Sequence, residues 1–204
     1  MKSMMRDAAI LFVITLIAGC LLGVVYDVTK GPIAEQEIKA KNEACQNVFA
    51  DAASFEAYDG FQATDAAALL AENDLDASID EVSSAKSADG TVLGYVVTVT
   101  DHEGYGGDIQ FSMGIQMDGT LNGISFLSIA ETAGLGMRAD EVLTPQFAGK
   151  QVESFTYTKT GASTDSEIDA ISGATITSNA VVNGVNAGLL YFQTVLMEGG
   201  AGNE

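Results

Sequence analysis

Residues 108–129, DIQFSMGIQMDGTLNGISFLSI, are the stretch that decides the fold class. Every second residue from Ile109 to Met117 is apolar, and this period of two is typical of a strand that buries one face. Asp118-Gly119 then interrupts the pattern, and Asp-Gly between two extended runs is a strong signal for a tight turn. The stretch therefore predicts a β-hairpin whose first strand has one buried face.

Further strands are predicted on both sides of this hairpin. Residues 81–100, EVSSAKSADGTVLGYVVTVT, place Asp89-Gly90 between two extended runs and predict a second hairpin. Residues 151–159, QVESFTYTK, predict one more strand. Because hairpins join antiparallel strands, the sequence favours a mostly antiparallel sheet.

Four segments have the pattern of helices. A stalk helix is predicted over residues 33–50, directly after Gly31-Pro32, and short helices are predicted near residues 65–72 and from Thr144-Pro145. The last helix is predicted to begin near Ile176. Its apolar stripe has a spacing of three to four residues and consists of Val182, Val185, Leu189, Phe192 and Leu196. These elements predict an α+β fold with helices packed on the sheet.

Residues 8–26, AAILFVITLIAGCLLGVVY, carry no charge. At about 1.5 Å per residue the run spans about 28 Å, close to a hydrocarbon core of about 30 Å. Lys2 and Arg6 precede it, so the positive-inside rule predicts a cytoplasmic N-terminus and an extracytoplasmic domain on the cell membrane. The expected segments are residues 1–7 in the cytoplasm, 8–27 as a single transmembrane helix, 28–81 as the stalk and connecting helical region, 82–197 as the main domain and 198–204 as a flexible tail.

Two other interpretations of this amino-terminal run stay open. A cleaved secretory signal has a shorter apolar region, of about 7–15 residues. Ile17-Ala18-Gly19-Cys20 resembles the processing box of a bacterial lipoprotein, although residues 21–26 stay apolar where a lipoprotein usually becomes polar. An uncleaved anchor and a lipid on Cys20 would leave the same domain tethered outside the cytoplasmic membrane.

The charge of the chain argues against a nucleic acid as partner. The 204 residues have a formal net charge of −19, and the 9 Lys and Arg form no cluster that could neutralise phosphates. Cys20 and Cys45 form no disulfide framework, and His102 is the only histidine, so the sequence has no zinc or haem pattern. Motifs of hydrolases and nucleotide-binding P-loops are also absent, and we assign no catalytic residue.

Residues 169–185, DAISGATITSNAVVNGV, gather four hydroxyl side chains where the last helix is predicted to begin: Ser172, Thr175, Thr177 and Ser178. One interpretation is capping, because Ser and Thr accept hydrogen bonds from the free N–H groups of a first helical turn. The other is an anion site, since a helix N-terminus offers N–H donors and about half a positive charge, which together hold a phosphate. A threonine at that position could also be esterified by the phosphate.

This stretch resembles a known flavin-attachment motif. Asp169-Ala170-Ile171-Ser172-Gly173-Ala174-Thr175 matches D-x-x-[ST]-G-A-T, the pattern of proteins that carry FMN in phosphoester linkage to the final threonine. Residues 103–126, EGYGGDIQFSMGIQMDGTLNGISF, and residues 131–136, ETAGLG, resemble the G subunits of Rnf electron-transport complexes. The C subunits of sodium-pumping NADH:quinone reductases are similar. Order and spacing agree over roughly residues 1–195.

The resemblance implies one covalent FMN per chain, attached to Thr175 by a flavin transferase that recognises Asp169. It also implies a set of cofactor contacts: Ser172, Gly173, Ala174, Thr177, Glu131, Thr132, Gly134, Leu135 and Gly136. Ser172 and Thr177 would donate hydrogen bonds to the phosphate or cap the helix. Ala133 stands where the family loop usually has proline, which loosens this loop but leaves its other residues in place.

Three other residues are less clearly assigned. Tyr105 lies among glycines and either stacks on a ring or fills a gap, whereas Lys150 either meets the phosphate or is solvated. His102 is expected in a surface loop.

By this resemblance the chain is an electron-relay subunit of a membrane-bound complex that couples ferredoxin oxidation and NAD⁺ reduction to Na⁺ or H⁺ transport. It would act with the other membrane subunits and carry out no substrate chemistry alone. The alternatives are a subunit of a Na⁺-translocating NADH:quinone reductase, a flavin-binding regulatory ectodomain and, from a different class, a lipid-anchored binding module without a cofactor.

Overall fold

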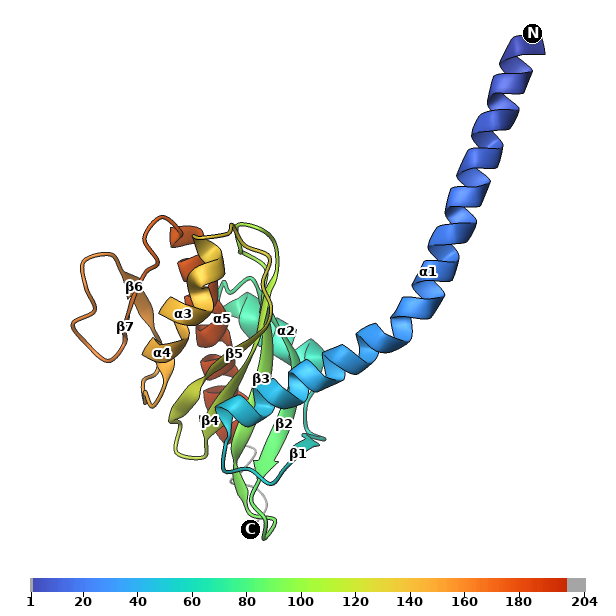
Figure 1. Cartoon of the computed structure of the whole chain (residues 1–204). Coiled ribbons are helices and arrows are strands. Elements are labelled where there is room, and N and C mark those ends of the chain that lie inside the picture. The colour runs from blue at the N-terminus through green and yellow to red at the C-terminus, as the bar shows by residue number, and fades with distance from the viewer. Residues whose placement is uncertain (1, 198–204) are drawn as a thin grey trace. The chain divides into compact units, whose positions relative to one another are not determined.

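A long amino-terminal helix precedes a sheet that is covered by helices (Figure 1). The computed structural model describes residues 2–197, so the tail predicted for residues 198–204 lies outside the described residues. Contacts between residues divide the chain into two units, Met1–Ala40 and Lys41–Glu204.

Helix α1, Lys2–Val48, contains the whole uncharged run of residues 8–26. It is long and apolar enough to cross a membrane, and no residue of its most apolar window is buried. The sequence predicted a break at Gly31-Pro32, whereas the helix continues through Pro32. A proline inside a helix removes one backbone hydrogen bond, at a cost of about 3 kcal/mol. The good helix formers that follow, such as Ala34 and Glu35, retain the helical conformation.

The second unit is built on a five-stranded antiparallel sheet with the strand order β1-β2-β3-β4-β5. The strands are Ser54–Ala57, Ala77–Lys86, Val92–Asp101, Ile109–Gln116 and Leu121–Ser128. Both predicted hairpins are present, as β2–β3 and β4–β5. Gly90 and Gly119 in their turns have a φ of +88°, which glycine adopts without strain. The predicted α+β class with a mostly antiparallel sheet is confirmed.

The region of residues 28–81, predicted to be helical, contains two pieces of the sheet. It contributes β1 and the first half of β2. Strand β1 lies at the edge of the sheet, has four residues and leaves three of them exposed. Such a strand lacks the alternation of apolar residues by which a sequence reveals a strand.

The strand predicted over residues 151–159 is shorter in the structure. Only β6, Thr156–Thr158, forms, and it pairs in parallel with β7, Glu167–Asp169. The preceding residue, Phe155, is held by a side chain instead: Asn186 accepts its N–H at 2.7 Å and donates to its carbonyl at 2.9 Å. Its backbone hydrogen bonds are therefore satisfied without a neighbouring strand.

Helix α5, Thr175–Tyr191, packs with α2, Ala63–Glu72, on one face of the sheet (Figure 1). It continues as a π-helical turn, η2, over Phe192–Leu196. The predicted helix start near Ile176 is confirmed to within one residue. All residues of the predicted stripe are buried: Val182, Val185, Leu189, Phe192 and Leu196. The helix packs on the alternating residues of β4, of which Ile109, Phe111, Met113 and Ile115 are buried. Met117, the last residue of the predicted alternation, follows the end of the strand and is exposed.

The chain between β5 and β6 forms three short helices: η1, Gly136–Arg138; α3, Ala139–Val142; and α4, Thr144–Phe147. The last of these begins at the predicted Thr144-Pro145. On the opposite face of the sheet, the end of α1 takes part in a second, smaller apolar cluster of Cys45, Val48, Phe49, Ala52, Ala85 and Val96.

Candidate functional site

A cavity of about 480 Å³ brings together three segments that are distant in the sequence. They are the loop between β3 and β4, the loop that follows β5, and the amino-terminal end of α5. The lining residues are Tyr105, Glu131, Thr132, Leu135, Gly136, Gly173, Ala174, Thr175, Ile176 and Thr177. The two motifs on which the family resemblance depends therefore face the same cavity.

The first turn of α5 has no side-chain cap within the described part of the chain. Its N-cap residue is Ala174, and the preceding turn is held by Ser178 instead. The buried Ser178 hydroxyl accepts the N–H of Ile171 and donates to the carbonyl of Ala174, both at 2.9 Å. Gly173 has a φ of +81° in this turn. Because first-turn N–H groups have no acceptor inside a helix, this arrangement leaves them for an anion.

The four hydroxyl groups of this motif have different surroundings. Ser178 is the one tied into the start of the helix, whereas Thr175 lines the cavity and is half-buried. Thr177 is buried and also lines the cavity. Ser172 is exposed and lies outside the lining. The structure therefore does not support the capping interpretation: a single buried serine, Ser178, holds the turn before α5.

Glu131 and Gly136 lie side by side in the cavity wall. Glu131 is 9% exposed as a whole residue, and its Oε1 accepts the N–H of Gly106 at 3.2 Å. Its Oε2 is buried and has no hydrogen-bond partner among the described residues. A Cβ at Gly136 would stand 2.6 Å from Thr177 Oγ1 and 2.8 Å from Glu131 Oε2. A buried oxygen without a donor is costly, so a ligand with an N–H or O–H group fits this place.

The loop of residues 131–136 folds around one carbonyl. The carbonyl of Thr132 accepts the N–H groups of Leu135 at 3.1 Å and Met137 at 3.2 Å. Large apolar side chains are exposed at the mouth of the cavity: Leu135 is 41%, Ile176 52% and Tyr105 69% exposed. Single exposed apolar residues are ordinary, but three around one cavity fit a planar aromatic ligand.

Some residues named by the resemblance lie outside the cavity lining, namely Ser172, Gly134 and Asp169. Asp169 ends β7, where its Oδ1 accepts the N–H of Ala162 at 2.6 Å and so holds the loop before β7. Lys150 pairs with Asp165 at 2.6 Å, beside a different cavity. Conversely, the sequence identified Ile176 only as the approximate start of the last helix, whereas the structure places it in the cavity lining, directly after Thr175.

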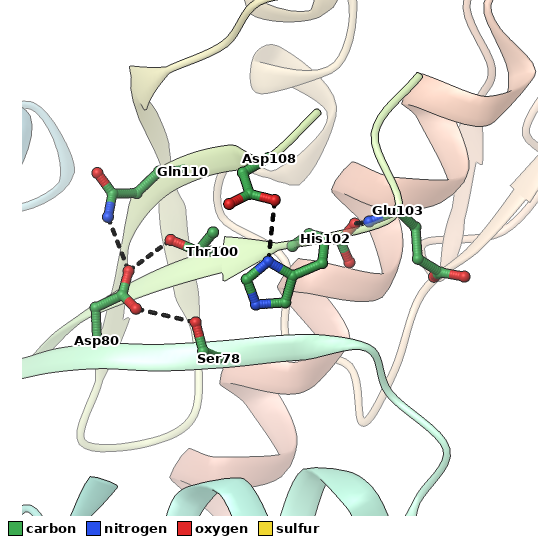
Figure 2. Close-up of polar contacts among 8 residues, drawn as sticks. Ser78, Asp80, Thr100, His102, Glu103, Asp108 and Gln110 are labelled. Atoms are coloured by element: carbon green, nitrogen blue, oxygen red, sulfur yellow. Dashed lines mark hydrogen bonds and ion pairs between the residues drawn. The ribbon is translucent and has the colours of Figure 1, made fainter. Parts of the chain in front are cut away.

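Polar side chains cluster where β2, β3 and β4 come together beyond this cavity (Figure 2). The Asp80 carboxylate accepts hydrogen bonds from Ser78, Thr100 and Gln110 at 3.0, 2.6 and 2.8 Å. His102 Nδ1 lies 3.1 Å from Asp108 Oδ1, and this hydrogen bond raises the pKa of the imidazole above its usual value. As expected, His102 is exposed.

Asp101 is the buried member of this region. It is the last residue of β3 and has no exposed surface. Its Oδ1 accepts the N–H of Glu103 at 2.9 Å, and its Oδ2 has no partner among the described residues. Burial raises the pKa of this carboxyl to about 7.

The cavity combines backbone donors at a helix start, an unsatisfied buried acceptor and an apolar mouth. These features suit a phosphate joined to an aromatic ring rather than a metal ion. No group of three or more His, Cys, Asp or Glu side chains in the described residues is placed to hold a metal. The fold and the cavity together define a domain that binds a phosphorylated aromatic cofactor.

Residues 104–190 match the family of FMN-binding domains, and residues 1–48 match the RnfG N-terminal region. The G subunit of the Na⁺-translocating ferredoxin:NAD⁺ oxidoreductase complex of Acetobacterium woodii is 36% identical to this chain, over 95% of the chain and 94% of that protein. The G subunit of the ion-translocating oxidoreductase complex of Methanosarcina acetivorans is 30% identical, over 93% and 95%. The chain belongs to this family of G subunits, as its motifs indicated.

Among solved structures, the crystal structure of Shewanella oneidensis NqrC is similar to this chain with a TM-score of 0.49 and 22% sequence identity. The similarity covers 59% of this chain and 61% of that one.

Proposed function

We propose that this chain is the flavin-carrying electron relay of a membrane-bound oxidoreductase complex, and that a phosphoester to Thr175 holds its FMN. The observation that carries the proposal is the position of Thr175, which is the first residue of α5 and lines the same cavity as the loop of residues 131–136. Membership of the family of G subunits supports the electron-transport role. The complex would couple ferredoxin oxidation and NAD⁺ reduction to the transport of Na⁺ or H⁺.

The phosphate would be held by backbone groups rather than by a basic side chain. The residues that line the cavity include no Lys or Arg, and the chain has a net charge of −19. The start of α5 provides positive potential at this place, because its N–H groups and its dipole attract an anion. A phosphoester bond would prevent FMN from dissociating. This suits an extracytoplasmic domain, from which a dissociated cofactor would be lost.

The ring would lie between the apolar residues at the mouth of the cavity, Tyr105, Leu135 and Ile176. FMN supplies a ring that takes up and releases one or two electrons. The chain would orient the ring and shield part of it from water, and Glu131 Oε2, which has no partner among the described residues, would be available to accept a hydrogen bond from an O–H or N–H group of the cofactor. Gly136 has no side chain and so leaves open the space beside Glu131 Oε2.

The remaining features support a place on the outer side of the membrane. Lys2 and Arg6 precede the apolar run of α1, which favours a cytoplasmic N-terminus with the transmembrane helix over residues 8–27. The domain would then be extracytoplasmic and act with the other membrane subunits of the complex. A flavin transferase would attach the FMN, with Asp169 as part of the motif that it reads.

The attachment site is tested by replacing Thr175 with valine, which has the same shape but no hydroxyl. The full chain is coexpressed with a flavin transferase, and its intact mass is measured. We expect the wild-type chain to carry the mass of one esterified FMN and Thr175→Val to carry none. Thr156→Val is the matched control, because Thr156 is an exposed threonine of β6 outside the cavity lining, so this variant should keep the covalent flavin.

A flavin that remains on Thr175→Val after denaturation would contradict the attachment site. A wild-type chain without flavin, isolated from its own host, would favour the lipid-anchored module, which also predicts a lipid on Cys20. A subunit of an NADH:quinone reductase would carry the same flavin mass, so it is distinguished by the subunits that copurify with the chain.

A further inference from the structure

The loop of residues 102–108, between β3 and β4, connects a buried carboxyl group to the cavity. At its tip, Tyr105 lines the cavity, and the N–H of Gly106 donates to Glu131 Oε1 at 3.2 Å. The loop fits closely against the chain after β5, because a Cβ at Gly106 would stand 2.0 Å from the carbonyl oxygen of Ala130. Because the loop is packed so tightly, a movement near Asp101 at its base would also move Tyr105 at its tip.

The base of the loop is fastened to α5 by two acidic residues. Asp101 faces the helix, since a Cβ at Gly184 would lie 3.3 Å from Asp101 Cβ, and its Oδ1 holds the N–H of Glu103 at 2.9 Å. Glu103 in turn accepts a hydrogen bond from the Asn183 side chain of α5 at 2.6 Å. Figure 2 shows Glu103 and the His102–Asp108 pair at this base. One hydrogen bond to a buried carboxylate is too few for a charged group.

We propose that Asp101 positions the loop of residues 102–108 against the flavin cavity, and that ionisation of its carboxyl group releases the loop. The part of the proposal that concerns the flavin rests on the proposed function, whereas the movement of the loop does not. When neutral, Asp101 keeps Glu103 in place and Tyr105 at the cavity. When charged, it has one donor and a buried Oδ2, so the loop opens to admit water.

The groups that face Asp101 act on its charge in both directions, and burial is the largest effect. The N–H of Glu103 stabilises a charge on Asp101 and so does His102, whereas the carboxylates of Glu103, on the loop, and of Asp76, before β2, repel it. Helix α5 offers the neutral Asn183 and Gly184 at this place, so no cation from the helix compensates. Burial raises the pKa of Asp101 to about 7, so ionisation falls near neutral pH.

The test measures hydrogen exchange of the peptide that contains residues 102–109 in the full-length chain in detergent. Protection, corrected for the intrinsic effect of pH, is compared at about pH 6 and about pH 8. We expect the wild-type loop to lose about tenfold in protection at the higher pH, and Asp101→Asn to change by less than about twofold. Asp101→Ser, which also keeps a neutral acceptor for the N–H of Glu103, should behave in the same way.

Two controls separate this carboxyl group from its neighbours. Asp80→Asn removes a carboxylate of the same sheet that already has three donors, so the transition of the loop should persist. His102→Gln removes the neighbouring imidazole, whose pKa is raised by its hydrogen bond to Asp108, and should also leave the transition in place. If Asp101→Asn and Asp101→Ser retain the wild-type pH dependence, or if His102→Gln alone abolishes it, the proposal is wrong.

The flavin provides the second readout. In the FMN-loaded chain, the visible circular dichroism of the oxidised flavin should change with the midpoint of the exchange transition, and Asp101→Asn should remove the change. A flavin signal that stays constant while the loop opens would refute positioning against the cavity. Thr175→Val, without flavin, should show the same exchange transition, so a failure of covalent attachment is recognised separately from a failure of the loop mechanism.

Discussion

At the scale of single residues, the hydroxyl of Ser178 holds the turn that presents Thr175. It is fully buried and bridges the N–H of Ile171 and the carbonyl of Ala174. Ser178→Ala leaves the buried Ile171 N–H without an acceptor, which costs about 1–3 kcal/mol. We expect a fall of this size in the free energy of unfolding, measured with urea. Ser172→Ala, at an exposed position of the same motif, should change it by less than about 0.5 kcal/mol.

Gly136 lies in the cavity wall where the neighbouring residues leave no room for a side chain. Gly136→Ala would place a methyl group 2.6 Å from Thr177 Oγ1 and 2.7 Å from Glu131 Cβ. Both neighbours are buried, so the strain is about 1–3 kcal/mol and the wall of the cavity shifts. We expect the fraction of chains with esterified FMN, measured by intact mass after coexpression, to fall several-fold. Ala133→Ser, in the exposed part of the same loop, is the control; equal loading of both variants would contradict a role for Gly136.

The residues of the site differ in how far the sequence revealed them. Thr175 and the loop of residues 131–136 could be named because they belong to short motifs with fixed spacing. The contact between Gly106 and Glu131 joins residues 25 positions apart and arises from the pairing of β4 with β5, so no local pattern announces it. Ser178 was one of four equivalent hydroxyls in the sequence, and only the fold of the turn distinguishes it.

At the scale of elements, the junction of β3 and α5 makes the stability of the domain depend on pH. The pKa of Asp101 is raised from 3.8 to about 7 in the fold, so the folded state keeps a proton that the unfolded chain loses. The contribution of Asp101 to the free energy of unfolding is therefore greatest below about pH 4. It falls as the pH rises toward 7 and stays constant above that pH. At about 1.4 kcal/mol per pKa unit, the loss is on the order of 4 kcal/mol.

Asp101→Asn should remove this dependence, because the amide copies the neutral carboxyl in shape. Relative to the wild-type chain, the variant should gain stability at about pH 8 and almost none at about pH 4. Urea unfolding of the full-length chain at several pH values measures the difference. Asp80→Asn is the matched control, since Asp80 has three hydrogen-bond donors in the fold. A constant difference between Asp101→Asn and wild type across the pH range would count against a raised pKa.

The elements that the sequence predicted well are those whose stability is local. The hairpins β2–β3 and β4–β5 have Asp-Gly turns, and α5 has an apolar stripe that matches the buried face. Strands β1 and β7 are short, polar and held by their neighbours, so their sequences carry no strand signal. The extent of α1 was underestimated for the opposite reason, because Pro32 is a strong local signal that a long helix overcomes.

At the scale of the whole molecule, the end of α1 belongs to the sheet rather than to the apolar run. Val48 and Phe49 are buried on the face opposite α5. Gly114 and Gly94 make room for them, since a Cβ at these positions would stand 2.9 Å from Val48 Cβ and 2.7 Å from the Phe49 ring. Asn122 also donates to the carbonyl of Val48 at 2.9 Å. Both faces of the sheet therefore need a helix.

This arrangement predicts where the chain can be shortened. A chain of residues 41–204 keeps the second apolar cluster and should unfold in one cooperative transition, with a stability close to that of the domain in the full chain. A chain of residues 54–204 loses Val48 and Phe49, exposes Val96 and Ala85, and should be destabilised by at least about 4 kcal/mol, since truncating one buried phenylalanine costs about 3–5 kcal/mol. Thermal and urea unfolding of the two chains measure the difference. Equal stability would mean that the end of α1 lies on the sheet without supporting it, and that the sheet needs α5 and α2 alone.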